Sequence, residues 1–468
     1  MRKISLYTRF AALAVTVLSM TFASCDDRLD IVPKGKTTLD KVADLETLLN
    51  QEYDLEESAG LRLGLICNEG FGAFVVVPEE LGQTATSTYA YYTYDESIDR
   101  AQLTQDDVVY RAAYKYINYA NVVISKTPDA SGDNTLKPQL IAEAKIIRAY
   151  MHFLLVNMYA KQYDKATADK EGGIAYVDNT DVAEQKTKLS LQETYDRILE
   201  DCSDEVIADL PEKNNNVERP DRALGNAVRA YVLRQMKRYD EAIPYAQASL
   251  KYNGSIEDRS VIMESGTWSL ANSLADNLLY IRGGARVSPT FYTITGMTYS
   301  YFEEGDYVLN YDMGAWNMMF GEMFSGIPGT ACYSGWDTMG NVWGLTSDRV
   351  YYLLAECLIR TGKTEEGLAF VDRVRKYRVE NAQPFAAKGV SEKDAMAMMQ
   401  RAKWVECIAT FENFFDCKRW NTEEAYARSF THELGDYGNY TIKPNSPLWV
   451  LPFPLNVTRI NPSMTQNY

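Results

Sequence analysis

Apolar residues recur at steps of three and four along most of this chain, and this period constrains the fold more than any other feature. A stripe of this spacing lies on one face of an α-helix. Residues 139–161 carry such a stripe, formed by Leu140, Ala144, Ile147, Met151, Leu154, Leu155 and Met158. The same pattern predicts helices over 191–210 (ended by Pro211), 223–236, 239–252, 347–361, 364–379 and about 392–412. The sequence therefore predicts an all-α fold.

Two of the predicted helix pairs fit the tetratricopeptide pattern. In residues 223–250 the small residue Ala230 lies on the first helix, and Tyr239 opens the second. Residues 348–374 repeat the arrangement, with Gly362 in the turn. A single pair of this kind is unstable alone and must stack on others. Because a long segment separates the two pairs, we expect a helical scaffold with a different structure inserted into it.

The inserted segment, about 253–346, is rich in glycine and lacks a helical period. It holds four of the seven tryptophans, including Trp268, Trp316 and Trp336. A second stretch of this type, about 60–98, holds a cluster of tyrosines. Long aromatic segments without a helical period are usually loops, and such loops in a compact domain tend to be functional. We therefore expect both stretches to be loop-rich and to carry a ligand-binding surface.

Aromatic side chains in these stretches are candidate ligand contacts, because ring faces bury the C–H faces of sugars while polar rims bind hydroxyl groups. If the tyrosine cluster is extended, Tyr89 and Tyr91 lie on one side and Tyr92 and Tyr94 on the other. The alternative is that the rings fill gaps beneath long loops. The candidate ligand-binding residues are Tyr89, Tyr91, Tyr92, Tyr94, Trp268, Tyr292, Trp316 and Trp336.

Charge excludes one class of partner. Lys and Arg number 48 and Asp and Glu number 64, so the net charge is -16. An acidic surface repels phosphates, which argues against a nucleic-acid partner. The chain has only two histidines, His152 and His432, so a His-rich metal site is not expected. No metal and no cofactor are predicted.

Motifs for catalysis are missing or incomplete. Gly362-Lys363-Thr364 resembles the end of a phosphate-binding loop, but Cys357 stands where that loop needs glycine, so an inter-helix turn is predicted. The sequence singles out no pair of carboxylates of the kind that a glycosidase requires. We therefore predict that the protein is not an enzyme, with an exported glycan hydrolase as an alternative. Buried free thiols are expected at Cys67, Cys202, Cys332, Cys357, Cys407 and Cys417.

The N-terminus reads as a lipoprotein signal peptide over residues 1–24. Arg2, Lys3 and Arg9 precede an uncharged stretch, which is too short to span a bilayer. Its end, Phe22-Ala23-Ser24-Cys25, resembles a bacterial lipobox, and lipidation is predicted at Cys25. Acidic residues follow at Asp26, Asp27 and Asp30, and these fit either a surface-export signal or a solvated tether.

Several motifs along the chain are similar, in order, to those of the SusD/RagB family of outer-membrane nutrient-binding lipoproteins from Bacteroidetes. Residues 25–33 resemble the opening Cys-x-x-x-Leu-Asp-x-x-Pro, residues 142–150 and 172–177 resemble two internal motifs, and residues 404–420 resemble the C-terminal Glu- and Arg-rich block. The final stretch, with Pro452-Phe453-Pro454 and Gln466-Asn467, resembles the family's ending. Ala175 stands where the family usually has proline, and Asn413 where it usually has glycine.

This resemblance implies a single SusD-like domain over 25–468, with four tetratricopeptide-like helix pairs and a less regular half that carries the ligand surface. The helices are expected within about 40–60, 108–252 and 347–380, and the C-terminal family block over about 392–468. The resemblance also implies a partner, a SusC-type TonB-dependent barrel, on which family members act as a lid. The expected location is the outer membrane, lipid-anchored and facing the exterior.

The sequence therefore predicts a surface lipoprotein that captures an oligosaccharide and delivers it to the barrel. An oligopeptide is the alternative ligand, because most family members are tied to glycans and some carry peptides. A tetratricopeptide adaptor that binds a protein chain is a further alternative, and it would leave the aromatic loops buried.

Overall fold

The computed structural model of the chain describes residues 39–50, 55, 57–73, 75–181, 183–261, 278–280, 292–311, 315–333 and 342–468. Helices dominate these residues, and the strands among them are two to four residues long. The all-α fold class predicted from the apolar period is therefore confirmed.

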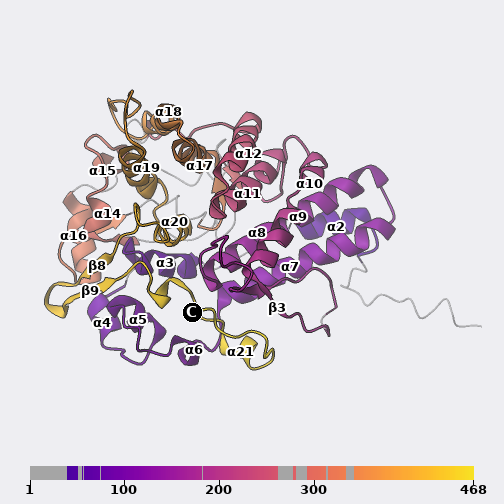
Figure 1. Cartoon of the computed structure of the whole chain (residues 1–468), viewed down its shortest axis with the longest axis horizontal. Helices are drawn as coiled ribbons and strands as arrows, with labels where there is room; N and C mark the ends of the chain where they lie inside the picture. Colours follow the sequence, from indigo (N-terminus) through magenta and orange to yellow (C-terminus); the bar gives the residue numbers. More distant parts are fainter. Residues whose placement is uncertain are drawn as a thin grey trace, which may run out of the picture.

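The two longest helices of the described residues pack on each other as a hairpin, α7 (Val108–Lys126) and α8 (Lys137–Tyr159). Asp107 caps α7, because its carboxylate accepts hydrogen bonds from the first backbone N–H groups of that helix. Nearly every residue of α8 from Leu140 onward is buried, so this helix runs through the core. The helices α2 (Val42–Leu49) and α9 (Leu191–Asp201) pack beside the hairpin (Figure 1).

Two further helix pairs pack closely. They are α11 (Arg222–Gln235) with α12 (Tyr239–Tyr252), and α17 (Ser347–Arg360) with α18 (Thr364–Arg375). Gly362 turns the chain between α17 and α18 at a φ of +83°, which confirms the predicted inter-helix turn. A Cβ added at Gly367 would lie 2.7 Å from the carbonyl oxygen of Ala355, so glycine allows the close approach of this pair.

Although they are far apart in the sequence, the two pairs lie side by side, because α12 packs on α17. Figure 1 shows the four helices α11, α12, α17 and α18 together in one part of the molecule. That the helices form four tetratricopeptide units stays a prediction.

Two of the predicted helices are interrupted. The helix expected over 392–412 ends at Glu406 as α19 (Glu392–Glu406), and the chain restarts as α20 (Glu412–Trp420) after Ala409 adopts a positive φ of 61°. The helix expected over 191–210 breaks after α9, where Ser203 caps the short helix α10 (Asp204–Ala208). In both cases the apolar period continues through the break, which is why the pattern alone gave one helix.

Buried ion pairs join these helices to one another. Arg419 of α20 reaches Glu356 of α17 at 2.7 Å, and Arg234 of α11 reaches Asp416 of α20 at 3.2 Å. All four side chains are at most 1% exposed. An arrangement that left one of these charges buried without its partner would cost free energy, so the pairs favour the observed arrangement of the helices.

The less regular half is built around a small sheet with the strand order β1 (Gly70–Ala73), β5 (Tyr292–Ile294) and β6 (Ala331–Tyr333), all antiparallel neighbours. A separate pair joins β4 (Leu278–Tyr280) to β7 (Leu345–Thr346). Short helices surround these strands: α3 (Glu57–Ile66), α4 (Val77–Leu81), α5 (Ser87–Thr93), α6 (Arg100–Leu103), α14 (Gly296–Tyr299), α15 (Tyr307–Tyr311) and α16 (Ala315–Ser325).

The expectation of a loop-rich stretch over 60–98 is therefore wrong for much of its length. In particular, Tyr89, Tyr91 and Tyr92 are not extended but lie in α5, and Tyr94 follows as its C-cap at a positive φ of 48°. The side chain of Thr86 accepts a hydrogen bond from the backbone N–H of Tyr89 and so caps the helix. Helical spacing replaces the two-sided arrangement expected for an extended segment.

The remaining elements among the described residues are small. They are the ribbons β2 (Gly172–Ala175) with β3 (Lys188–Ser190) and β8 (Phe430–Glu433) with β9 (Asn439–Ile442), the helix α21 (Leu455–Thr458), and four 3-10 turns, η1 (Thr127–Asp129), η2 (Asn134–Leu136), η5 (Gly435–Tyr437) and η6 (Pro447–Trp449).

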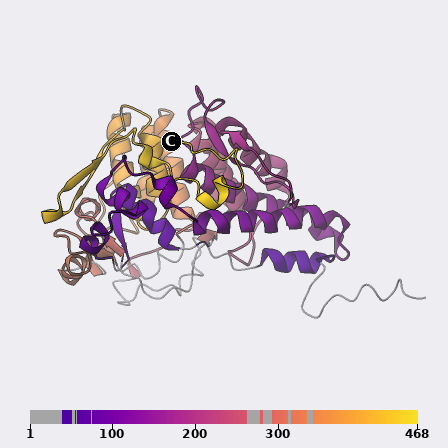
Figure 2. The same cartoon turned by 90° about the horizontal axis from the view of Figure 1, so that it is seen from below.

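The two ends of the molecule carry different elements. Figures 1 and 2 show α2 and the far end of the α7–α8 hairpin at one end, and α14, α16, β8 and β9 at the other. The described chain begins at the α2 end.

The described residues also test two smaller expectations. The six cysteines named above are all free and buried, which confirms the prediction of buried thiols. Within the described ranges, no helix combines the length and apolar character that crossing a membrane would require.

Candidate functional site

Four of the eight candidate aromatic residues are core residues. Tyr91, Tyr92, Tyr94 and Tyr292 are 2%, 1%, 7% and 0% exposed. Their hydroxyl groups are satisfied by protein partners, as buried tyrosines require. For these residues the alternative interpretation, rings that fill space within the protein, describes the structure better than an exposed ligand surface.

Two of these tyrosines meet around His432. The hydroxyl of Tyr94 lies 2.7 Å from Nε2 of His432, and Nδ1 of the same ring lies 2.9 Å from the carbonyl oxygen of Tyr92. Nε2 also lies 3.0 Å from the carbonyl oxygen of Leu65, so both ring nitrogens have partners within the protein. Burial lowers the pKa of His432 to about 4.

A buried carboxylate lies beside this group. The hydroxyl of Tyr292 donates to Glu69 at 3.0 Å, and Asn413 and the backbone N–H of Ala409 donate to the same carboxylate. Burial raises the pKa of Glu69 to about 7, although these donors oppose the shift. This cluster connects the small sheet to α20, and its residues line neither of the two cavities described below.

The other candidates have different outcomes. Tyr89 is half-buried on α5 and stays a candidate. Trp268 and Trp336 lie outside the described residues, as does the lipidation site Cys25, and Trp316 belongs to α16 with its side chain outside the description. The ligand-binding prediction for the three tryptophans is therefore untested.

The structure instead shows a hollow of about 710 Å³ at the start of α7. Three segments far apart in the sequence form its walls: the first turns of α7, the chain that follows β2, and the chain around α21. The lining residues are Asp106, Tyr110, Arg111, Tyr114, Ala175, Val177, Asp181, Ala183, Glu184, Gln185, Lys186, Asn456, Val457, Ile460, Asn461 and Met464.

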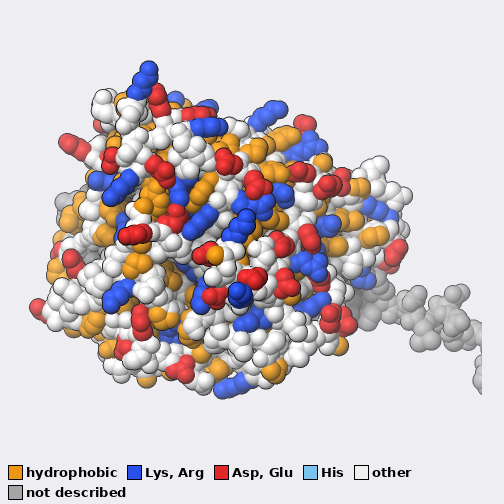
Figure 3. All heavy atoms as spheres, viewed as in Figure 1, with side chains coloured by type: hydrophobic (Ala, Val, Ile, Leu, Met, Phe, Trp, Pro, Cys, Tyr) orange, Lys and Arg blue, Asp and Glu red, His pale blue; other side chains and the backbone are white. Residues whose placement is uncertain are grey.

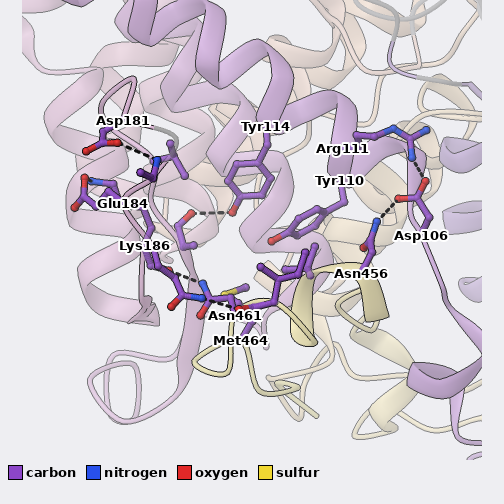
Figure 4. Close-up of a pocket in the computed structure, with 16 residues that line it drawn as sticks. Asp106, Tyr110, Arg111, Tyr114, Asp181, Glu184, Lys186, Asn456, Asn461 and Met464 are labelled. Atoms are coloured by element: carbon purple, nitrogen blue, oxygen red, sulfur yellow. Dashed lines mark hydrogen bonds and ion pairs between the residues drawn. The ribbon is translucent and has the colours of Figure 1, made fainter.

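Two tyrosines of α7 form the floor. Tyr110 and Tyr114 are one helical turn apart, with ring centroids 4.8 Å apart, and both point from the helix into the hollow (Figure 4). The hydroxyl of Tyr114 donates to the carbonyl oxygen of Ala175 at 2.7 Å, which fixes one wall to the helix. Tyr110 packs edge-on against Tyr159 and Phe453, so its ring is held rigidly.

His152 contacts the same wall through Val177. Nε2 of His152 accepts a hydrogen bond from the backbone N–H of Val177 at 3.2 Å, and Nδ1 faces the carbonyl oxygen of Arg148 at 2.9 Å. The ring stacks on Tyr176 at 3.8 Å. Burial lowers the pKa of His152 to about 3, so the imidazole is neutral at physiological pH. It positions the wall and does not itself line the hollow.

Charged and amide groups form the rim on two sides. On one side Asn456 donates to Asp106 at 2.9 Å, and Asp106 also pairs with Arg111. On the other, Lys186 lies 3.0 Å from Glu184, and the backbone carbonyl of Lys186 accepts from Asn461 at 2.7 Å. Figure 4 shows these two groups flanking the tyrosine floor.

The rim carboxylate Glu184 is suited to accepting hydrogen bonds rather than to donating a proton. Hydrogen bonds from Asn179 and Lys186 lower the pKa of Glu184. Burial opposes protonation of Lys186, but its hydrogen bonds with Asp178 and Glu184 outweigh burial and raise the pKa of this lysine. Both groups are therefore charged at neutral pH. The described residues contain no group of His, Cys, Asp and Glu side chains that could hold a metal ion.

Sequence reasoning missed this hollow. Its one local signal is the spacing of Tyr110 and Tyr114, which places two tyrosines on one face of a helix. An isolated tyrosine pair is as typical of a core as of a binding surface. The remaining lining residues come from segments whose proximity no local pattern reveals.

Comparisons with known proteins identify the family. Residues 37–234 match a SusD-like family model described as "Starch-binding associating with outer membrane", and residues 349–468 match the SusD/RagB model, described as "SusD family". Together the two matches span more than half of the chain. No curated protein matched the sequence.

Solved structures share the fold over nearly the whole chain. A SusD superfamily protein from Bacteroides thetaiotaomicron superposes with a TM-score of 0.67 at 15% identity, covering 92% of this chain and 100% of that one. A SusD-like carbohydrate binding protein from Bacteroides vulgatus gives a TM-score of 0.62 at 14% identity, covering 91% and 97%. Surface glycan-binding protein A from Bacteroides fluxus gives 0.65 at 15% identity, covering 92% and 98%. On the two family matches, and with the fold in agreement, this chain belongs to the SusD/RagB family.

Proposed function

We propose that this protein is a nutrient-binding lipoprotein, anchored through Cys25 and exposed at the cell surface, that captures an oligosaccharide and delivers it to a SusC-type TonB-dependent transporter. Family membership supports the general role. The family model matched by residues 37–234 is described by starch binding and association with the outer membrane. Two of the structural relatives are named as carbohydrate- or glycan-binding proteins.

The hollow at the start of α7 is the observation that carries the choice of ligand. Its volume of about 710 Å³ lies within the range of about 300–1,000 Å³ that small-molecule sites occupy, and it suits a short stretch of an oligomer. Tyrosine rings offer apolar surface to C–H groups, while Asp181, Gln185 and Asn456 offer acceptors and donors to hydroxyl groups. A neutral oligosaccharide presents both kinds of group at once.

The same rim supports binding without hydrolysis. A glycosidase needs one carboxyl group that keeps its proton near neutral pH and a second that is ionised. Hydrogen bonds from Asn179 and Lys186 lower the pKa of Glu184, which does not favour this carboxyl group as the general acid. We therefore propose capture without turnover.

A blocking substitution tests the proposal. Ala183 lines the hollow and is exposed, so the indole of Ala183→Trp would fill the space. Because the alanine side chain makes no hydrogen bond, the substitution removes none. Residues 26–468 would be titrated by calorimetry with a panel of neutral oligosaccharides and a pool of oligopeptides. We expect binding of an oligosaccharide without product formation, and at least a tenfold loss of affinity in Ala183→Trp.

The matched control is Ala208→Trp, because Ala208 is also exposed, lies on α10 and lines neither of the two cavities. If the two variants bind with equal affinity, the ligand does not occupy this hollow. If only peptides bind, the choice of an oligosaccharide is wrong.

A further inference from the structure

A second cavity lies on another part of the surface, and it shares no lining residue with the hollow at the start of α7. Its volume is about 340 Å³. The chain just beyond α8, the helix α20, the segment around η6 and the residue Tyr468 enclose it. The lining residues are Lys161, Gln162, Lys418, Thr422, Pro444, Asn445, Ser446, Pro447, Trp449, Val450 and Tyr468.

The ionisable side chains of this lining are basic, unlike the chain as a whole. The protein has a net charge of -16, yet the lining side chains include two lysines and neither Asp nor Glu. Figure 3 shows Lys and Arg side chains interspersed with Asp and Glu side chains across the middle of the face in view. Within an acidic surface, such a cavity selects for anions through its own side chains.

Lys418 is the innermost basic group. It is only 4% exposed, and its ammonium group donates to the carbonyl oxygens of Asn157, at 2.7 Å, and Ala160. An ammonium group has three donors, and these two carbonyls account for two of them. No ion pair among the described residues joins Lys418 to a carboxylate. Burial lowers the pKa of Lys418 to about 7, as expected for a buried amine without an anionic partner.

The second lysine lies at the rim. Lys161 is 49% exposed and pairs with Glu171 at 3.0 Å. Because this pair is exposed, its net contribution is small and an incoming anion can share the lysine. The two lysines thus differ in role: Lys418 is held inside the cavity by two carbonyl oxygens, and Lys161 is exposed at the rim.

The rest of the lining indicates the shape of the anion. Pro444, Pro447, Trp449, Val450 and Tyr468 form an apolar wall, and the exposed amide of Asn445 lies at the opening. A bare inorganic ion would leave this apolar wall unused. A compact ring that carries a carboxylate and hydroxyl groups would use the lysine, the wall and the amide together.

We propose that this cavity is a binding site for a carboxylate-bearing monosaccharide unit, a hexuronic acid or a ring of the same size and charge. The site is separate from the hollow assigned to the neutral oligosaccharide, and it does not depend on that assignment.

Three probes distinguish the contribution of the negative charge to binding from that of the sugar ring. Glucuronate carries both, glucose carries the ring without the charge, and acetate carries the charge without the ring. Binding to residues 26–468 would be measured by calorimetry at low ionic strength. We expect glucuronate to bind at least tenfold more tightly than either glucose or acetate. Equal affinity for glucose, or equal affinity for acetate, would overturn the proposal.

Two variants then locate the site. Asn445→Trp blocks the opening while leaving the hydrogen bonds of Lys418 in place, and it should weaken glucuronate binding at least tenfold. Lys418→Met removes the inner charge and should have a similar effect. Since Lys418→Met also removes two helix-end hydrogen bonds, its folding is checked by circular dichroism, and Asn445→Trp provides the test if that variant unfolds.

Ala183→Trp is the internal control because it fills the other hollow. It should leave glucuronate affinity unchanged, whereas a loss there would place the acid in the first hollow and contradict the second site. Failure of glucuronate to bind at all would also overturn this inference, and it would leave the result of the neutral-oligosaccharide titration unaffected.

Discussion

His152 and His432 are buried in neutral form, and each ring nitrogen has a defined backbone or hydroxyl partner. Burial lowers their pKa values from 6.5 to about 3 and about 4. Between pH 6.5 and these values, the unfolded chain binds protons that the folded protein does not. The stability contributed by each neutral histidine is therefore complete above pH 6.5 and is lost as the pH falls below it.

A glutamine substitution isolates this effect. Per histidine, the free energy of unfolding should fall by about 1.4 kcal/mol for each pH unit between 6.5 and the folded pKa. Because Glu69 has a raised pKa of about 7, its contribution has the opposite sign between pH 7 and 4.5 and masks part of the slope. We therefore expect urea unfolding of His152→Gln to depend less steeply on pH than that of the wild type. If the free energy of unfolding depends on pH equally steeply in the two proteins, His152 does not titrate in this way.

At the scale of the elements, the sequence predicted helices more successfully than loops. The helix over 239–252 was predicted with its observed bounds, because the residues that open it and the apolar period that follows are both local signals. The break between α19 and α20 was not predicted, because Cys407 and Ile408 continue the apolar pattern while the backbone turns at Ala409. The tyrosine cluster in α5 was assigned to a ligand surface for a related reason: its composition resembles a loop, but its burial depends on distant partners such as His432.

The helix arrangement depends on buried charges that can be tested directly. Glu356 accepts hydrogen bonds from Arg419 at 2.7 and 2.8 Å and from the indole N–H of Trp420 at 2.8 Å. Removing one partner of a buried ion pair typically costs about 3–5 kcal/mol, because the other charge remains buried. We expect Glu356→Ala to lower the free energy of unfolding by this amount in urea titrations. The double variant Glu356→Met with Arg419→Met should lose less, and a larger loss would mean that the pair itself stabilises the bundle.

At the scale of the whole molecule, the family and the end-to-end fold agree with the motifs read from the sequence. The hollow at the start of α7 could not be predicted, because Tyr114, Ala175 and Asn456 are brought together only by the complete fold. The proposed membrane attachment depends on the N-terminal segment, which lies outside the described residues. Two or three acyl chains on Cys25 would contribute about 0.8 kcal/mol per buried CH₂ group, which is enough for stable anchoring.

Cys25→Ser tests this anchor. The variant should move from the membrane fraction to the soluble fraction when cells are fractionated, and metabolic labelling with a fatty acid should be lost. Replacement of a buried cysteine such as Cys202 by serine serves as the control, because labelling should persist there. Persistent labelling of Cys25→Ser would place the lipid elsewhere.

The walls of the hollow at the start of α7 also have a consequence for the order of folding. The α7–α8 hairpin is local in sequence and can form early, whereas the wall around α21 must close over a loop of several hundred residues. The binding surface is thus expected to be completed late, after the bundle has formed. It can also come apart on its own, because release of the segment around α21 would erase the hollow while the hairpin beneath it stays folded. A ligand bound between the α7–α8 hairpin and the segment around α21 would hold the two together. Its affinity would therefore include the free energy of keeping that segment in place.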